Sequence, residues 1–361
     1  MERNEKKILI VTNSLSFGGS ERVVLNTSEM FLDNGFTVHL AVIRNIVELP
    51  VDDRIILHSN AVVDKLLKYK AVMNIFVRLW LDRLVKTYGP FLLILSNHQA
   101  RTSIISPVYH ERLYFWIHND FGSIAKGAKE RKRIRKFFDH KNLIAVSKGA
   151  ARSIVQDIGV RPGSLHTIYN PFDISKIQAQ AGADYAVEKP KYPFVLHAGR
   201  YEKIKRHDLL FQAWNHVVFE GKLVLLTEHH ADLEKMICEY GIADRVHIVG
   251  FQKNPYPWFK DAKLTVISSD SESLSNVLIE SLILKTPVVS TDSCGPAEIL
   301  TGALSEFLVP TNDPAALAEK ISSALANPPA IDEKTVQRFS SETVFQQYCG
   351  LLDRSTLTEN C

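Results

Sequence analysis

The sequence contains only four cysteines among its 361 residues, at positions 238, 294, 349 and 361. No two of them form a Cys-x-x-Cys pair, and none clusters with histidine at metal-ligand spacing, so neither a disulfide framework nor a zinc site is predicted. A chain of this length buries enough apolar surface for two cores without such cross-links. We therefore expect four free thiols in a reducing compartment.

Long hydrophobic runs are also absent. The polar N-terminal residues pass directly into an apolar run at 8–11, which is too short for a signal peptide and has no small-residue cleavage site. No segment offers the ~18 near-continuous apolar residues of a membrane span. The sequence therefore predicts a cytoplasmic protein. It also lacks G-x-G-x-x-G and Walker A motifs, and the first absence disfavours a nicotinamide-dependent dehydrogenase.

The charge is distributed unevenly along the chain. Residues 1–170 carry 25 Lys and Arg against 15 Asp and Glu, a net charge of +10, whereas residues 171–361 carry 18 against 25, a net charge of −7. Such asymmetry indicates that the first half faces an anionic partner. Segment 126–141 reads as a cationic amphipathic helix, and a second stretch mixes apolar and basic side chains: Lys65, Lys68, Lys70, Phe76, Arg78, Leu79, Trp80, Arg83, Leu84 and Lys86.

Short apolar runs alternate with helical patterns along almost the whole chain. The strand-like runs are 6–12, 36–43, 91–96, 113–117 and 142–147, followed by a second series at 194–198, 223–227, 246–249, 264–268 and 287–290. This alternation predicts βαβ units in parallel sheets covered by helices on both faces. Segment 181–193 is rich in glycine, proline and charge, which indicates a linker between two α/β domains.

A candidate ligand-binding loop follows the first predicted strand of each series. Gly18 and Gly19 precede a helical pattern, where paired glycines admit a ligand to the backbone and the helix N-terminus favours an anion. After the run at 194–198 comes the segment 199–206, in which four of eight residues are basic. The carboxyl end of a parallel strand is where open α/β sheets bind ligands, and Arg and Lys suit phosphate oxygens.

A third candidate site combines a polar loop with a helix. Glu272 lies in the loop after the run at 264–268, and Glu280 lies on the following amphipathic helix with seven residues between them. A carboxylate can accept hydrogen bonds from paired sugar hydroxyls, and the helix N-terminus between the two can hold a phosphate. The same residues are also compatible with a capped surface helix, because Ser and Asn are good N-cap residues.

Taken in order, these segments resemble glycosyltransferase family 4, a large family of retaining enzymes. Gly18-Gly19 resembles its glycine-rich loop, Ile117-His118-Asn119 its strand-end histidine segment, and Gly199-Arg200 with Lys205 its basic diphosphate motif. Val249-Gly250-Phe251 is similar to its base-pocket strand end. Glu272 through Glu280 resembles its E-x7-E signature, followed by Thr286-Pro287-Val288-Val289 and Gly295-Pro296-Ala297-Glu298.

The resemblance implies a fold and a division of the chain. The fold is α/β of the GT-B type, in which two Rossmann-like parallel-sheet domains face each other across a cleft. Residues 1–180 would form the acceptor-binding domain and residues 192–339 the nucleotide-sugar-binding domain. A C-terminal helix within 340–361 would pack back on the first domain.

The resemblance also implies a reaction and roles for single residues. The donor would be a nucleotide-diphosphate sugar, with UDP favoured over GDP, and the enzyme would be a hexosyltransferase that retains the anomeric configuration without a covalent nucleophile. The implied catalytic residues are Glu272, His118, Arg200 and Lys205. The implied binding residues are Arg200 and Lys205 for the diphosphate, Gly250 and Phe251 for the base, Glu280 for the ribose, Leu274, Ser275 and Asn276 for the donor, and Gly18 and Gly19 for the acceptor.

Two single positions depart from the family pattern, as does the segment 301–306, which stands where the family commonly has small residues. Ser273 stands where glycine usually follows the first signature glutamate, and Arg206 stands where glycine usually follows the basic-motif lysine. No Asp-x-Asp occurs, the motif by which glycosyltransferases of the other main fold hold a divalent ion. We therefore expect no metal and no other cofactor, with Arg200 and Lys205 supplying the positive charge at the diphosphate.

The implied acceptor is a hydroxyl of a lipid-linked glycan or oligosaccharide in surface polysaccharide or lipopolysaccharide biosynthesis. The basic stretches predict peripheral contact with an anionic membrane, at the inner face of the cytoplasmic membrane. They belong to no recognised nucleic-acid-binding motif, so nucleic acid is not an expected partner. Two other functions stay open: a sugar-nucleotide epimerase of the same architecture, which would consume the donor without an acceptor, and a non-catalytic nucleotide-sugar-binding protein.

Overall fold

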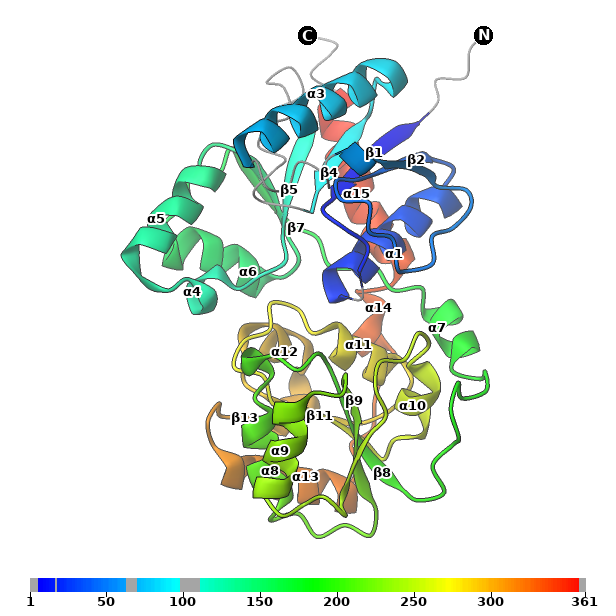
Figure 1. The fold of residues 1–361 in the computed structure, drawn as a ribbon, viewed down its shortest axis with the longest axis vertical. Helices are drawn as coiled ribbons and strands as arrows, with labels where there is room; N and C mark the ends of the chain where they lie inside the picture. Colours follow the sequence, from blue (N-terminus) through cyan, green and yellow to red (C-terminus); the bar gives the residue numbers. More distant parts are fainter. Residues whose placement is uncertain (1–5, 17, 63–69, 98–110, 357–361) are drawn as a thin grey trace. The chain divides into compact units, whose positions relative to one another are not determined.

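The computed structural model of the protein describes residues 6–16, 18–62, 70–97 and 111–356 (Figure 1). Lys65 and Lys68 of the predicted second basic stretch lie outside these residues. The chain separates into two compact units, one formed by Met1–Phe172 with Phe339–Cys361 and the other by Asp173–Arg338. Each unit is an α/β structure built on one parallel sheet, as the sequence predicted.

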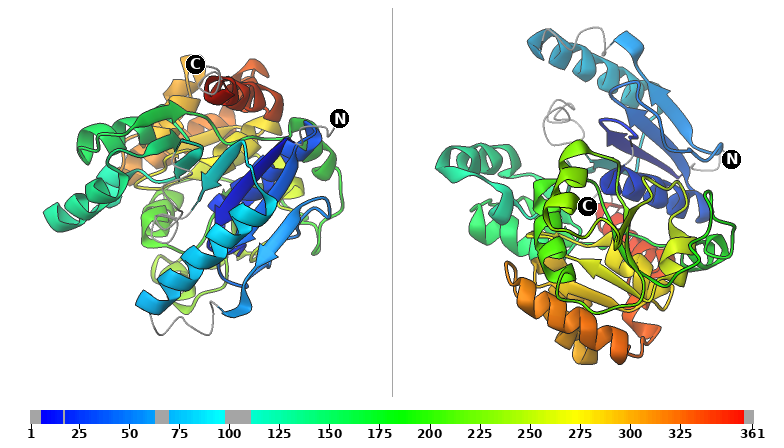
Figure 2. Two further views of the ribbon diagram at one scale, coloured as in Figure 1. Left: turned by 90° about the horizontal axis from the view of Figure 1, so that it is seen from above. Right: turned by 60° about the horizontal axis from the view of Figure 1, so that its bottom comes forward.

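The described part of the first unit contains a seven-stranded sheet in the order β3-β2-β1-β4-β5-β6-β7, and each neighbouring pair is parallel. The order of the strands reverses between β1 and β4, which are hydrogen-bonded neighbours in the middle of the sheet. The left view of Figure 2 shows the first unit from above. The strands are β1 (Lys7–Thr12), β2 (Thr37–Val42), β3 (Ile56–Ser59), β4 (Leu93–Ser96), β5 (Leu113–Ile117), β6 (Asn142–Ala145) and β7 (Ser164–Thr167).

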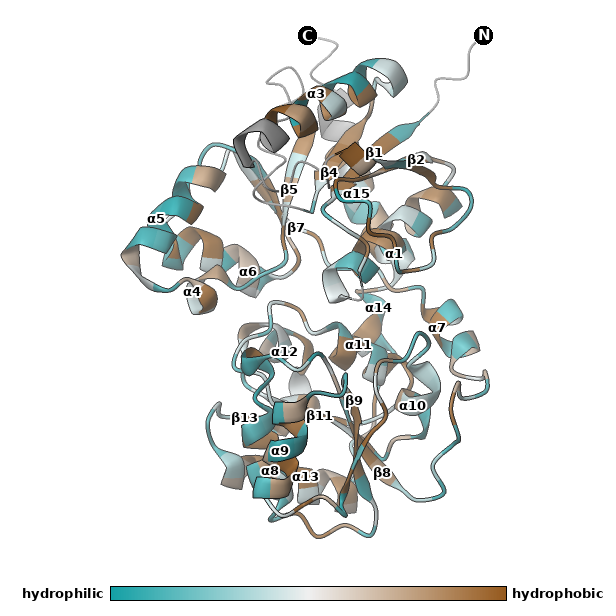
Figure 3. Cartoon of the chain, in the orientation of Figure 1, coloured by the Kyte–Doolittle hydropathy of each residue, from teal (hydrophilic) through white to brown (hydrophobic). Residues whose placement is uncertain are grey.

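Helices accompany these strands in the described part of the first unit. They are α1 (Gly19–Asp33), α3 (Lys70–Tyr88), α4 (Phe121–Ile124), α5 (Gly127–Phe138), α6 (Lys148–Arg152), a π-helical turn at Ser153–Asp157, and α15 (Ser341–Thr356). The predicted cationic helix at 126–141 is confirmed as α5. Ile134 and Phe138 of α5 pack into the core, while its basic side chains are largely exposed, as its hydrophilic colouring in Figure 3 indicates.

In the second unit a six-stranded parallel sheet runs in the order β10-β9-β8-β11-β12-β13. Its strands are β8 (Phe194–Ala198), β9 (Lys222–Leu226), β10 (Val246–Ile248), β11 (Leu264–Ile267), β12 (Val288–Thr291) and β13 (Leu308–Val309). Its helices are α7 (Ile174–Gln180), α8 (His207–Trp214), α9 (Ala231–Glu239), α10 (Tyr256–Asp261), α11 (Asn276–Ile283), α12 (Cys294–Ile299), α13 (Pro314–Ala326) and α14 (Lys334–Gln337), with 3-10 turns at Lys203–Lys205 and Gly302–Phe307.

The division between the units falls earlier than residue 180, where the sequence predicted the first domain to end. It lies between Phe172 and Asp173, so α7 belongs to the second unit. The predicted linker at 181–193 is attached to that unit as well. The Tyr185 hydroxyl donates to Asp261 across 2.8 Å, and Lys189 Nζ lies 2.7 Å from the same carboxylate. These contacts hold the predicted linker against α10 of the second unit.

The C-terminal helix α15 returns to the first unit, where it lies beside α1 (Figure 1). Tyr348 of α15 is buried with its ring edge-on to Phe31 of α1, at a centroid distance of 5.3 Å. The indole N–H of Trp116 on β5 donates to the Tyr348 hydroxyl across 3.0 Å. The last helix is thus tied both to the covering helix α1 and to the sheet beneath it.

Among the described residues, no helix combines the length and the apolar character needed to cross a membrane.

Replacing Tyr348 by Phe tests how strongly α15 holds the first unit. The variant keeps the buried ring and leaves the Trp116 N–H without its acceptor in an apolar interior. We expect the free energy of unfolding to fall by about 1–3 kcal/mol, measured by urea denaturation. Tyr88→Phe is the matched control, because Tyr88 is 41% exposed and its hydroxyl can bond water. Equal effects of the two substitutions would contradict the assigned role of this hydrogen bond.

Candidate active site

Two of the predicted site loops follow β8 and β11, which are parallel neighbours in the sheet of the second unit. β8 pairs with β9 on its other side, so the order of the strands reverses between β8 and β11. The carboxyl ends of both strands meet at this switch point, the position where open α/β sheets bind ligands. The two loops therefore lie next to each other at one edge of the sheet.

The structure brings Lys205 and Glu272, two of the predicted catalytic residues, into direct contact. Nζ of Lys205 donates to Oε1 of Glu272 across 2.6 Å, and the Ser269 hydroxyl donates to the same oxygen across 2.8 Å. The side chains of Lys205 and Glu272 are only 25% and 15% exposed, so water and salt screen this pair less than a surface pair. A cation suited to phosphate and a carboxylate suited to sugar hydroxyls thus lie at one point.

Further hydrogen bonds join the two loops along their backbones. The Asp270 N–H donates to the Ile204 carbonyl across 2.9 Å, and the Ser268 hydroxyl donates to the Lys205 carbonyl across 2.8 Å. The sequence indicated no separate role for Ser268, Ser269 or Asp270 within the third candidate site, because a serine or aspartate in a polar loop is typical of an ordinary turn. Their signal was their place immediately after a buried strand.

Gly295, at the start of α12, supports the Glu272 loop from the other side. Its N–H donates to the Glu272 carbonyl across 2.8 Å. A Cβ at this position would lie 2.8 Å from that same carbonyl oxygen and 2.9 Å from the Ser273 carbonyl carbon. Both atoms belong to the backbone and cannot move aside cheaply, so a side chain here would push the Glu272 loop away from α12.

Two buried histidines lie close to the ion pair. His197 on β8 and His207 at the start of α8 pack with ring centroids 4.8 Å apart, and each is only 2% exposed. Removal from water lowers the pKa of His197 to about 4 and that of His207 to about 2. Both imidazoles are therefore neutral at pH 7 and add no charge beside Lys205.

The second signature glutamate lies on a helix, as the sequence predicted. Glu280 on α11 is 5% exposed, and the Tyr256 hydroxyl lies 3.4 Å from its Oε1. Leu274 and Ser275 are buried in the turn that enters α11, with Ser275 at the N-cap and Asn276 as the first helical residue. Tyr256 contacts this predicted ribose-binding carboxylate and was not identified from the sequence.

Three other predicted donor-binding residues follow β8 and β10. Arg200 is exposed, and its Nη2 lies 3.1 Å from Oε1 of Glu202. Gly250 follows β10 with a φ of +86°, a conformation that favours glycine, and Phe251 beside it is 39% exposed. Because β10 is parallel to β9 and β8, both residues lie at the same edge of the sheet as the loops described above.

The remaining predicted residues belong to the first unit. Gly18 is the N-cap of α1 and Gly19 its first residue, and they follow β1 at the reversal of strand order. His118 follows β5 and contacts the Trp116 ring edge-on at a centroid distance of 5.5 Å. Enclosure by protein lowers the pKa of His118 to about 4, so this imidazole is neutral at pH 7.

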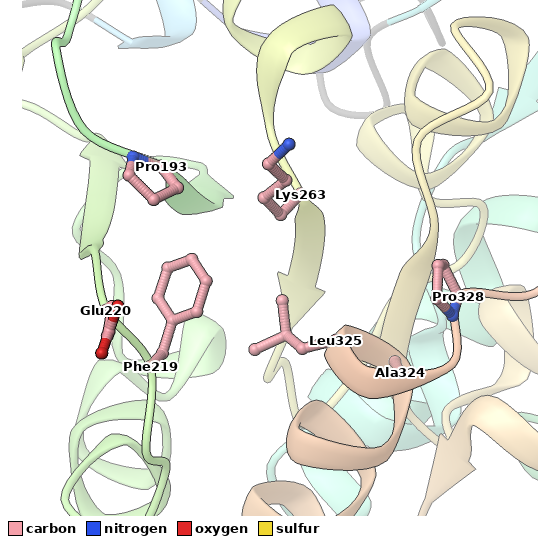
Figure 4. A pocket seen from close by; sticks show the side chains of 7 residues that line it. All are labelled: Pro193, Phe219, Glu220, Lys263, Ala324, Leu325 and Pro328. Atoms are coloured by element: carbon pink, nitrogen blue, oxygen red, sulfur yellow. The ribbon is translucent and has the colours of Figure 1, made fainter.

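A pocket in the second unit lies at the other end of its sheet (Figure 4). It is lined by Pro193, Phe219, Glu220, Lys263, Ala324, Leu325 and Pro328. Pro193 and Lys263 immediately precede β8 and β11, which places the pocket at the amino ends of the strands, away from the candidate site. Among the described residues, no three His, Cys, Asp or Glu side chains gather closely enough to hold a metal ion.

Curated proteins with similar sequences are glycosyltransferases. The chain is 35% identical over 158 residues to the N-acetylgalactosamine-N,N'-diacetylbacillosaminyl-diphospho-undecaprenol 4-alpha-N-acetylgalactosaminyltransferase of Campylobacter jejuni, a match that covers 43% of this chain and 42% of the relative. It is 29% identical over 170 residues to the lipopolysaccharide core biosynthesis glycosyltransferase LpsE of Rhizobium meliloti, covering 44% and 49% of the two chains. The matches thus span less than half the length of either relative.

Solved structures share the fold over nearly the whole chain. The HepE protein of Anabaena in complex with UDP and glucose has a TM-score of 0.74 at 18% identity, covering 97% of this chain and all of that one. The TarM protein of S. aureus has a TM-score of 0.76 at 15% identity, covering 96% and 99%.

Two family models match the two halves of the chain separately. The model described as Glycosyltransferase Family 4 matches residues 17–176, and the model described as Glycosyl transferases group 1 matches residues 192–327. These ranges contain the glycine loop and His118 in the first half, and the Lys205–Glu272 pair with Glu280 in the second. The chain belongs to glycosyltransferase family 4, as its sequence motifs indicated, and has the GT-B fold.

Proposed function

We propose that the protein transfers a hexosyl unit from a UDP-sugar to a hydroxyl of a lipid-linked glycan in surface polysaccharide or lipopolysaccharide biosynthesis, with retention of configuration. The observation that carries this proposal is the pairing of Lys205 with Glu272 at the switch point between β8 and β11. Two relatives support the substrate classes. The Campylobacter enzyme is named for a diphospho-undecaprenol acceptor, and HepE was solved with UDP and glucose.

In this proposal the donor displaces an existing ion pair. The diphosphate takes the place of the Glu272 carboxylate at Lys205 Nζ, and Glu272 turns to the hydroxyls of the donor sugar. Arg200, already exposed, swings from Glu202 onto the phosphates. Phe251 stacks on the base, Glu280 accepts from the ribose hydroxyls, and the amides of 274–276 bind the donor.

Catalysis in this proposal is electrostatic. As the bond between sugar and diphosphate breaks, negative charge grows on the leaving nucleotide, where Lys205 and Arg200 stabilise it. The acceptor hydroxyl attacks from the same face, held near the loop of Gly18 and Gly19. Neutral His118 binds the donor sugar by a hydrogen bond and does not add a third cation. No divalent ion is required for this charge stabilisation.

The same proposal includes contact of the first unit with an anionic membrane at the inner face of the cytoplasmic membrane. Helix α3 exposes Ile75 at 59%, Phe76 at 45% and Leu79 at 60%. Ile75, Leu79, Arg83 and Lys86 follow at i, i+4, i+8 and i+11, so they share one face of the helix. An apolar patch continued by basic side chains fits the interface of an anionic leaflet, where each basic residue adds about 1 kcal/mol.

Ligand-induced stabilisation tests the donor. We expect UDP to raise the melting temperature, whereas GDP, ADP, CMP and NAD leave it nearly unchanged. A ligand at 100 times its Kd adds about 2.7 kcal/mol of stability. EDTA should not alter the shift if the site works without metal. Stabilisation by NAD alone, or loss of the UDP shift in EDTA, would contradict the proposal. Consumption of a UDP-sugar without any acceptor would favour an epimerase.

Substitution at the ion pair tests the electrostatic mechanism. Lys205→Ala should lower kcat/KM about 100- to 1,000-fold, the loss typical of removing one preorganised donor to developing charge. Lys203→Ala is the matched control, because Lys203 is exposed on the same turn and two residues away. The control should stay close to wild type in a coupled assay of UDP release. Equal losses in both variants would mean that the overall positive charge of the loop, and not Lys205, stabilises the leaving group.

Vesicle co-sedimentation tests the membrane contact. Ile75→Ser with Leu79→Ser should reduce binding to phosphatidylglycerol-containing vesicles, and Arg83→Glu with Lys86→Glu should reduce it most at low salt. Val218→Ser is the control, because Val218 is 95% exposed but belongs to the second unit. Undiminished binding in both α3 variants would refute the contact through this face.

A further inference from the structure

Arg206 occupies a backbone conformation that is unfavourable for its residue type. Its φ and ψ are both +51°, in the left-handed region, and its side chain is only 17% exposed. Non-glycine residues are uncommon there, and such a conformation persists where surrounding contacts hold it in place. Glycine would adopt this backbone with less strain, so the contacts of the Arg206 side chain are what hold the residue in this conformation.

The guanidinium group of Arg206 is bound by acceptors from three segments. Nε and Nη2 donate to the Asp208 carboxylate across 2.9 Å each, at the start of α8. Nη1 donates to Oδ1 of Asp270 across 2.6 Å, in the loop after β11. Nη1 also donates to Oδ1 of Asn312, in the loop after β13. The side chain thus links loops that follow three different strands.

The Arg206–Asp270 pair joins the same two loops as the ion pair of the candidate site. Arg206 directly follows Lys205, and Asp270 precedes Glu272 by two residues. The loop after β8 and the loop after β11 are therefore joined twice by opposite charges, once at Lys205–Glu272 and once at Arg206–Asp270. The second pair is not among the groups proposed to bind the diphosphate, so it needs no exchange when a donor arrives.

The positive charge of Arg206 stabilises the two carboxylates that it contacts, Asp208 and Asp270. Without Arg206, the carboxylates of Asp208 and Asp270 would face each other across the loop and repel. Partial burial alone would raise the pKa of Asp208, but the hydrogen bonds and charge of Arg206 outweigh it and hold that pKa below its usual value. The Asp208 carboxylate stays ionised, and the cluster keeps its geometry at neutral pH.

We propose that Arg206 is a positioning residue that holds Lys205 and Glu272 at the spacing a nucleotide-diphosphate sugar requires. The inference rests on the proposed function for its substrate, but the fixation of the two loops is a property of the chain itself. When the donor separates Lys205 from Glu272, the Arg206–Asp270 pair keeps the two loops in register. A residue that only capped α8 would stabilise the fold without this effect on turnover.

Arg206→Gly is the decisive variant, since glycine adopts the left-handed backbone without strain and the protein should fold. We expect kcat/KM to fall about 10- to 100-fold, the loss typical of a small displacement of catalytic groups, mostly through kcat. Arg206→Lys should recover part of kcat, because an ammonium can still reach one of the carboxylates.

Lys285→Gly is the matched control. Lys285 follows the C-cap of α11 with a φ of +61°, and its Nζ lies 3.2 Å from Oε1 of Glu333, so the substitution also removes an ion-paired cation from a left-handed backbone position. It should leave kcat/KM unchanged. Wild-type turnover by Arg206→Gly, or an equal loss in Lys285→Gly, would overturn the inference.

A measurement without ligand separates this inference from the proposed function. Hydrogen–deuterium exchange at the Asp270 amide, which donates to the Ile204 carbonyl, should be faster in Arg206→Gly than in wild type or Lys285→Gly. Unchanged exchange would overturn the fixation of the loops whatever the substrate. If wild type neither binds a nucleoside diphosphate nor transfers a sugar, the proposed function fails, and exchange at Asp270 still decides whether Arg206 holds the loops.

Discussion

The ion pair between Lys205 and Glu272 depends on the parallel pairing of two strands that are far apart in the chain. Because β8 and β11 lie side by side with their carboxyl ends together, loops that begin at Gly199 and Ser268 meet, and opposite charges come within 2.6 Å. Each charge is partly removed from water and would be costly to leave alone, so each stabilises the other until a ligand replaces one of them. The two loops are therefore held together in the absence of a ligand, and a ligand that takes the place of one partner has to break this pair.

Much of the fold could be predicted from the sequence, because central strands in a doubly covered parallel sheet are nearly continuous apolar runs. Each strand predicted in either half is present within one or two residues of its expected bounds. The strands that were not predicted are β3, β7 and β13, all at sheet edges. In β3 two apolar residues, Ile56 and Leu57, are exposed, β7 is half-buried throughout, and β13 has two residues. Edge strands bury one side less, so their sequences carry a weaker pattern.

At the candidate site, residue types were predictable and their contacts were not. The two loops could be singled out because charged residues follow buried strands, and the family resemblance then pointed to Lys205 and Glu272 within them. The direct contact of these two residues depends on strand order, which local patterns do not encode. Ser269 and Asp270 carried no separate signal, and Arg206 appeared only as a departure from a glycine position. Its left-handed backbone and its three acceptors exist because loops after β8, β11 and β13 converge. Tertiary contacts there override the local preference of the residue.

The two crossings of the chain between the units are themselves held together. The Phe172 N–H donates to the Phe339 carbonyl across 2.9 Å, and the Ser341 N–H donates back to the Phe172 carbonyl across 2.9 Å. The second unit is thus one continuous segment, and the residues that precede and follow it, Phe172 and Phe339, are hydrogen-bonded to each other. A domain inserted in this way can keep its own core. Asp173–Arg338 contains Lys205, Arg206, Glu272 and Glu280 together, so the contacts that organise the proposed donor site form within one unit. The proposed acceptor loop and His118 belong to the first unit. That unit is held together with α15 by the hydrogen bond from Trp116 to Tyr348, which involves none of the donor-site residues.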